Sequence, residues 1–158
     1  MFLIKGLAST PTVDTESHLV ALKSLVWTKG LVPLLYDHDE KQVAGRILDL
    51  AWSDAGLLIT CEAENKYANQ PAFSVRFAVR EHEIIGLGAS AYALVKRAVL
   101  REVSLVSRPA CQGALVTSCE KIKPAEVEAV KDWNDFAERS AQRKVALNLL
   151  LAEMRAGA

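Results

Sequence analysis

The chain has 158 residues, of which 51% are hydrophobic and 24% are charged, and this composition suits one globular domain with a sizeable core. Its 19 basic and 19 acidic residues give a formal net charge of zero, so no overall field favours nucleic acid or an anionic membrane as a partner. No apolar run is long enough to span a membrane, and three cysteines without metal-ligand spacing indicate a reducing cytoplasm and no metal site.

The first 62 residues predict short strands around one helix. Strands are expected at 2–8, 31–36, 43–52 and 56–62, the last two joined by a turn. Between the first two strands, capping residues from Asp14 precede leucines at helical spacing, which predicts a short helix through Trp27. His38 follows the second strand in a polar loop. It is either a solvated surface histidine or a general base mounted on a rigid strand.

Residues 71–81 fit two patterns. Phe73, Val75 and Phe77 alternate as in a strand, yet Phe73 and Phe77 also follow helical spacing. Pro71 suits the first turn of a helix, and a short crossover would deliver the chain to the next strand. The sequence therefore favours a helix over 71–81.

The segment 83–113 predicts a hairpin that carries a hydroxyl in one strand and a carboxylate in the other. Ser90 lies in the first strand, and Glu102 lies in the apolar return strand that ends at Pro109. A three-residue turn such as 96–98 would place Ser90 and Glu102 on the same face of the hairpin. A two-residue turn would place them on opposite faces.

The end of the chain differs in composition from the rest. A last strand is expected at 115–117, and a run rich in Ala, Glu, Lys and Leu, without Gly or Pro, then continues from Ala125 to Arg155. It predicts one long helix or two short ones with an intermittent apolar stripe. We therefore expect a β-rich domain at 1–122 and a helical extension at 123–158. The extension would pack on the domain, on a second subunit or on a partner.

Ser90, His38 and Glu102 supply the three side-chain types of a serine hydrolase. A serine hydroxyl is a weak nucleophile until a base removes its proton, and the base works best when a third polar group orients it. Gly86 and Gly88 would let the backbone near Ser90 approach a substrate closely, or they mark a bulge in the strand. This chemistry requires no metal ion and no organic cofactor.

The run LREVSLVSRPA at 100–110 resembles the EVSLVxxPA signature of the prohead proteases of tailed bacteriophages, the serine peptidases of capsid maturation. Earlier segments resemble other motifs of that family in the same order: KGLA at 5–8, VPLLYDHD at 32–39 followed by VAGRI at 43–47, GLLI at 56–59 and GLGASAY at 86–92. The resemblance extends over residues 3–114.

The resemblance implies a herpesvirus-assemblin-like fold, a compact antiparallel β-barrel with flanking helices, and an endopeptidase with His38 as base and Ser90 as nucleophile. Glu102 is the expected third member. The substrate would be capsid or scaffold protein, or the protease itself, inside the prohead that assembles in the host cytoplasm, and a homodimer is suggested. The family usually has Ser-Ile-Gly-Phe at the nucleophile, whereas the chain has Ser-Ala-Tyr-Ala at 90–93.

Two other functions remain open because a fold or a motif alone does not determine activity. The first is a catalytically inactive protein of capsid assembly on the same fold. The second is an unrelated small β-barrel binding module. Labelling of Ser90 by a serine-reactive probe would favour the protease, and a Ser90 buried in apolar packing would favour the binding module.

Overall fold

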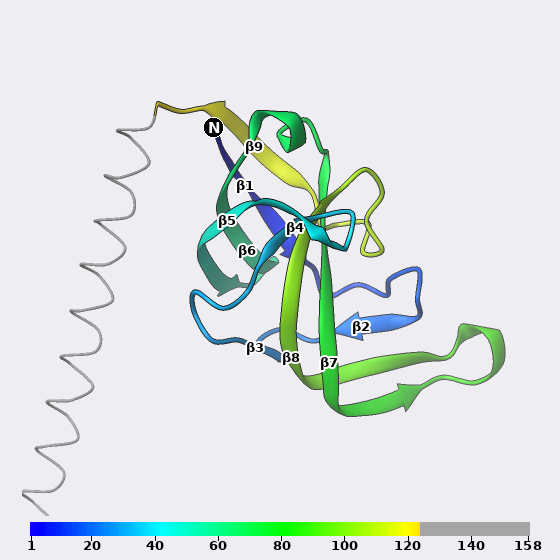
Figure 1. Ribbon diagram of the computed structural model, residues 1–158. Helices are drawn as coiled ribbons and strands as arrows, with labels where there is room; N and C mark the ends of the chain where they lie inside the picture. Colours follow the sequence, from blue (N-terminus) through cyan, green and yellow to red (C-terminus); the bar gives the residue numbers. More distant parts are fainter. Residues whose placement is uncertain (124–158) are drawn as a thin grey trace, which may run out of the picture. The chain divides into compact units, whose positions relative to one another are not determined.

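The computed structural model describes residues 1–123, and most of these residues lie in β-strands (Figure 1). Residues Met1–Ile122 form one compact unit. The prediction of a mainly β domain is confirmed. The helical extension predicted for 123–158 lies, apart from Lys123, outside the described residues.

Strands and two short 3-10 helices alternate along the described chain. In order they are β1 (Phe2–Ser9), β2 (His18–Val20), β3 (Leu25–Val26), β4 (Leu34–Tyr36), β5 (Asp39–Ser53), β6 (Gly56–Ala63), η1 (Asn65–Tyr67), β7 (Ala72–Ile85), η2 (Gly88–Ser90), β8 (Tyr92–Val106) and β9 (Val116–Lys121). The strands predicted at 2–8, 43–52 and 56–62 correspond to β1, β5 and β6.

All nine strands of the described residues belong to one curled sheet. β7 pairs antiparallel with one edge of β8, while β2, β3 and β4 pair in parallel with successive parts of its other edge. From β4 the sheet continues antiparallel through β5, β6 and β1 to β9. A bridge between Ala72 and Leu115 joins β7 to the segment before β9, so the sheet takes a barrel-like shape.

The hydrophobic core lies along one face of this sheet because side chains alternate along each strand. β7 and β8 contribute Phe73, Val103 and Leu105, each fully buried. Residues of β1, β4 and β6 pack in the same cluster, among them Ile4, Leu34, Leu57 and Ile59. The residues that alternate with Phe73, Val103 and Leu105 on β7 and β8 point to the opposite face of the sheet.

The helix predicted over 71–81 is wrong, because residues 72–81 belong to β7. The strand-like alternation of Phe73, Val75 and Phe77 prevails since one face packs on the core and β8 pairs with the segment from Ala72 onward. Pro71 precedes the strand, where a missing N–H group removes no ladder hydrogen bond.

The helix predicted between Asp14 and Trp27 is also wrong. Ser17 and Lys23 adopt left-handed backbone angles, with φ of 61° and 63°, which a right-handed helix does not allow. Instead β8 provides hydrogen-bond partners, such as the carbonyl of Val95, which accepts from the Ala21 N–H at 3.2 Å. The flanking helices expected from the family resemblance are therefore absent from the described residues.

The turn predicted at 96–98 is wrong as well, since these residues lie inside β8. The hairpin turns instead at 86–91, where Gly86 and Gly88 have φ of 84° and 61° and Gly88–Ser90 forms η2. Irregularities in the β7–β8 register follow Arg76, Val79 and Glu81. Such bulges bend a strand pair, and the far end of the hairpin extends away from the rest of the sheet (Figure 1).

Phe73 offers a test of the core. Replacement of this fully buried ring by alanine, Phe73→Ala, should lower the free energy of unfolding by about 3–5 kcal/mol, because it leaves a cavity under β7. Leu87→Ala is the matched control, since Leu87 is 90% exposed, and it should change stability by less than about 0.5 kcal/mol. Urea unfolding measures both values. Equal stability of the two variants would contradict the position of Phe73.

Candidate functional site

The register of β7 and β8 places four polar side chains on one face of the strand pair. Ser74 lies directly opposite Ser104, and Arg76 lies directly opposite Glu102. Directly opposed residues project from the same face, and residues two positions apart on a strand share that face. This face is opposite to the one that carries Phe73 into the core. The pairing alone therefore forms a polar cluster.

The turn between β4 and β5 brings His38 to this cluster. Asp37 and His38 form a two-residue connection with φ of 49° and 61°, the left-handed angles of a type I′ turn. Such angles cost about 1–2 kcal/mol for a residue other than glycine. Two hydrogen bonds to β8 hold the turn: the Asp37 N–H donates to the Leu105 carbonyl at 3.1 Å, and the His38 N–H donates to Ser104 Oγ at 3.1 Å.

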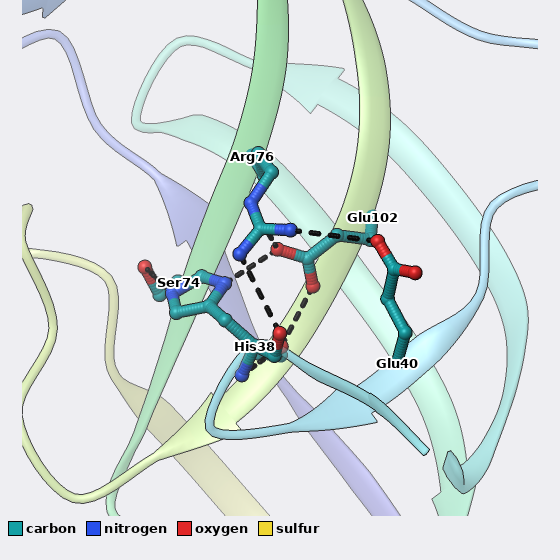
Figure 2. Close-up of polar contacts among 6 residues, drawn as sticks. His38, Glu40, Ser74, Arg76 and Glu102 are labelled. Atoms are coloured by element: carbon teal, nitrogen blue, oxygen red, sulfur yellow. Dashed lines mark hydrogen bonds and ion pairs between the residues drawn. The ribbon is translucent and has the colours of Figure 1, made fainter. Parts of the chain in front are cut away.

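The imidazole of His38 connects a carboxylate and a hydroxyl (Figure 2). Its Nδ1 lies 2.5 Å from Glu102 Oε1, and its Nε2 lies 2.9 Å from Ser74 Oγ. Because an ionised carboxylate only accepts hydrogen bonds, Nδ1 carries the proton and the lone pair of Nε2 is free to accept from the Ser74 hydroxyl. Serine, base and orienting carboxylate thus stand in the order that nucleophilic catalysis requires.

The carboxylate of this arrangement is buried and has partners on both oxygens. The Glu102 side chain is only 5% exposed, whereas that of His38 is 31% exposed. Ser104 donates to Glu102 Oε2 at 2.6 Å. The Arg76 guanidinium lies 3.9 Å from Glu102 Oε1 and donates to the His38 carbonyl at 3.4 Å. A buried charge is tolerated under these conditions because it is paired and hydrogen-bonded.

A cleft of about 560 Å³ opens beside Ser74 and His38. Its walls come from the end of β1, the loop at 10–18, the start of β7 and the loop at 108–112. Along the described chain, no strand pairs with the cleft side of β7 beyond Ala72. The Phe73 N–H, directly before Ser74, donates to the Ala114 carbonyl at 2.8 Å, so the backbone of β7 is open to a ligand on that side from Val75 onward.

The structure brings two of the three predicted site residues together. His38 and Glu102 are in contact, but Ser90 lies in η2 at the far end of the hairpin, beyond the last strand pair, Ile85 with Tyr92. The exposed Ser90 donates its hydroxyl proton to the Leu87 carbonyl at 3.0 Å. Ser74 occupies the position next to the imidazole that the sequence assigned to Ser90.

A signal for Ser74 was present in the sequence. Residues 74–77 read Ser-Val-Arg-Phe, which keeps the serine and the phenylalanine of the Ser-Ile-Gly-Phe pattern at the same spacing. The predicted helix over 71–81 hides this match, because a serine on a helix would not lie on a strand paired with that of Glu102. Ser104 lies inside the EVSLV run, and alternation along the strand predicts that it shares a face with Glu102. The structure adds that its hydroxyl bonds to both Glu102 and His38.

Comparisons with known proteins give no match: no protein-family model fits the chain, and no curated protein is similar to it. Among residues 1–123 no cluster of three or more His, Cys, Asp or Glu could hold a metal ion, and no helix there is long and apolar enough to cross a bilayer.

The cleft also contains a cysteine whose environment differs from that of the other two. Partial burial by itself raises the pKa of the Cys111 thiol, but hydrogen bonds from Thr10 and Thr12 and from the backbone outweigh it, so the pKa lies below its usual value. Burial raises the pKa of Cys119, and burial raises that of Cys61 to about 12. The thiolate is the reactive form, so Cys111 should be the most reactive of the three at neutral pH.

Alkylation with iodoacetamide tests this environment. At neutral pH Cys111 should react faster than the more exposed Cys119, while the fully buried Cys61 should stay unmodified until the protein unfolds. The advantage of Cys111 should shrink as the pH rises, because Cys119 then ionises as well. Peptide mass mapping over time measures the order, and a faster reaction at Cys119 would contradict it.

Proposed function

We propose that this protein is a serine endopeptidase of the prohead-protease type, with Ser74 as nucleophile, His38 as general base and Glu102 as the group that orients the base. The observation that carries the proposal is the continuous contact from Ser74 through His38 to Glu102 at the edge of a cleft. The EVSLVxxPA-like run supports it from the sequence, because Glu102 is the first residue of that pattern.

The geometry supports a two-step hydrolysis. Ser74 Oγ attacks the carbonyl carbon of the scissile peptide bond while its proton passes to Nε2 of His38, and Glu102 stabilises the imidazolium that forms. The same proton then goes to the leaving amine as the C–N bond breaks, which leaves an acyl ester on Ser74. Water enters, gives a proton to His38 and attacks the ester, and the proton returns to Ser74 as the new carboxylic acid departs.

The cleft suits an extended polypeptide as substrate. The open backbone edge of β7 beside Ser74 offers hydrogen-bonding groups that an added strand could pair with. By the family resemblance the substrate is capsid or scaffold protein, or the protease itself, in the prohead within the host cytoplasm, and the enzyme works as a homodimer. The barrel-like curl of the sheet is compatible with an assemblin-like barrel, which we include in the proposal.

An inactive protein of capsid assembly on the same fold is the second candidate. The far end of the β7–β8 hairpin favours it, because Ile84 and Leu87 are 62% and 90% exposed there. An assembly protein would use these two side chains in its contact surface. This candidate predicts co-assembly with capsid protein and no cleavage.

The choice between Ser74 and Ser90 as nucleophile gives the decisive test. Ser74→Ala should abolish cleavage of co-expressed capsid protein and labelling by a fluorophosphonate probe, since both need a hydroxyl activated by His38. Ser90→Ala is the matched control and should keep both, because Ser90 bonds only to the Leu87 carbonyl. Intact-mass spectrometry of capsid protein and protease over time measures cleavage and labelling together.

Each outcome of that experiment assigns the site. Loss of activity in Ser90→Ala alone would return the nucleophile to the hairpin turn and contradict the role of Ser74. Unchanged masses in the wild type and in both variants, with capsids still forming, would support the assembly protein instead. The Ser74→Ala variant should fold normally, because only one hydroxyl is removed.

The roles of the other two groups should differ in size. His38→Ala removes the base and should lower kcat by about 10⁶-fold, whereas Glu102→Gln keeps the shape and should lower it by about 10⁴-fold, as analogous changes do in other serine proteases. Glu62→Gln is the control, since Glu62 is equally buried and pairs with Arg46 outside the cleft. Steady-state kinetics gives kcat, and wild-type activity in Glu102→Gln would transfer the orienting role to another residue.

A further inference from the structure

We propose that Ser104 is a positioning residue of this site, whose hydroxyl fixes the Glu102 carboxylate and the His38 backbone in one geometry. This inference rests on the proposed function for its effect on catalysis, but its geometric part does not. Ser104 does not touch the cleft, so it would act only through Glu102 and His38.

The hydroxyl of Ser104 donates one hydrogen bond and accepts another within the site. It donates a hydrogen bond to Glu102 Oε2 at 2.6 Å, and it accepts a hydrogen bond from the His38 N–H at 3.1 Å. Ser104 is fully buried, opposite Ser74 on β7 and beside Leu35 on β4. One side chain therefore connects the strand that carries the carboxylate to the turn that carries the base.

Both bonds control the position of the imidazole. Without the bond to Oε2, the Glu102 carboxylate loses its donor on that oxygen and can rotate away from His38 Nδ1. Without the acceptor for the His38 N–H, the left-handed turn loses one of the bonds that hold it on β8. Each change moves Nε2 relative to Ser74. A shift of this kind lowers the rate of a chemical step more than it lowers substrate binding.

The hydrogen bond between His38 Nδ1 and Glu102 supplies a readout that needs no substrate. A proton shared between an imidazole and a carboxylate at short distance resonates far downfield of amide protons in one-dimensional ¹H NMR, provided that the pair is held together and shielded from water. The wild type should show this signal. It should disappear or broaden in Ser104→Ala, which removes the hydroxyl, and return in Ser104→Thr, which restores one.

Ser24→Ala is the matched control. Ser24 is also a buried serine, 3% exposed, but its hydroxyl has no hydrogen-bond partner and lies outside the cleft. A general effect of deleting a buried hydroxyl would appear in both variants, whereas a positioning role would appear in Ser104→Ala alone. In kinetics, Ser104→Ala should lower kcat by about tenfold to a hundredfold with little change in KM, and Ser24→Ala should change neither.

The outcomes separate this inference from the proposed function. Loss of the downfield signal in Ser104→Ala and its return in Ser104→Thr support the inference, even if the wild type cleaves nothing and the proposed function fails. A signal and a kcat that persist in Ser104→Ala overturn the inference, even if Ser74 proves to be the nucleophile. If Ser104→Ala does not fold, Ser104→Cys provides the test: its thiol is a weaker donor, so a signal as sharp as in the wild type would overturn the inference.

Discussion

The buried carboxylate of Glu102 is the constraint on which the rest of the site depends. An ionised group that is only 5% exposed must be paired and hydrogen-bonded, or its removal from water costs several kcal/mol. Its partners come from three segments: His38 from the β4–β5 turn, Ser104 from its own strand and Arg76 from β7. Turn and strands must therefore meet in one register, because a slip of β7 or of the turn would leave the charge with Ser104 as its remaining partner.

The alternation of β8 explains how one short run serves both core and site. Val103 and Leu105 are fully buried in the hydrophobic cluster, while Glu102 and Ser104 project to the other face and bond with each other and with His38. Because β8 is paired on both edges, by β7 and by β4, its backbone cannot shift without breaking two ladders. The EVSLV-like run thus combines apolar packing with a rigid mount for polar groups.

The parts of the fold that could be predicted are those in which local pattern and tertiary packing agree. β1, β5 and β6 follow from alternation and turn residues, and the β8 run from its apolar residues. The helices at 14–27 and 71–81 were wrong because pairing with β8, a long-range interaction, overrides local spacing. The contact between His38 and Glu102 was expected from motif order. The contact between Ser74 and His38 was not expected, since the position of Ser74 opposite Ser104 depends on the length of the hairpin.

That hairpin length also separates two regions with different physical character. Up to Arg76 the β7–β8 pair is held by β4, which pairs with β8. The rigidity of this region keeps Ser74, His38 and Glu102 at hydrogen-bonding distance. Beyond the register irregularities the pair continues with only the short strands β2 and β3 beside it, and it ends in an exposed turn with Leu87 at its tip. β2 pairs with β8 as far as Ala93, so only the turn at 86–91 projects beyond the paired strands. Leu87 in this turn adds little to the packing of the fold, and contact with a partner would explain its apolar side chain better than folding does. Cleavage and assembly contacts would then use opposite ends of the same two strands. The two candidate functions differ in whether the protein cleaves, and a contact surface at the tip of the hairpin fits either of them.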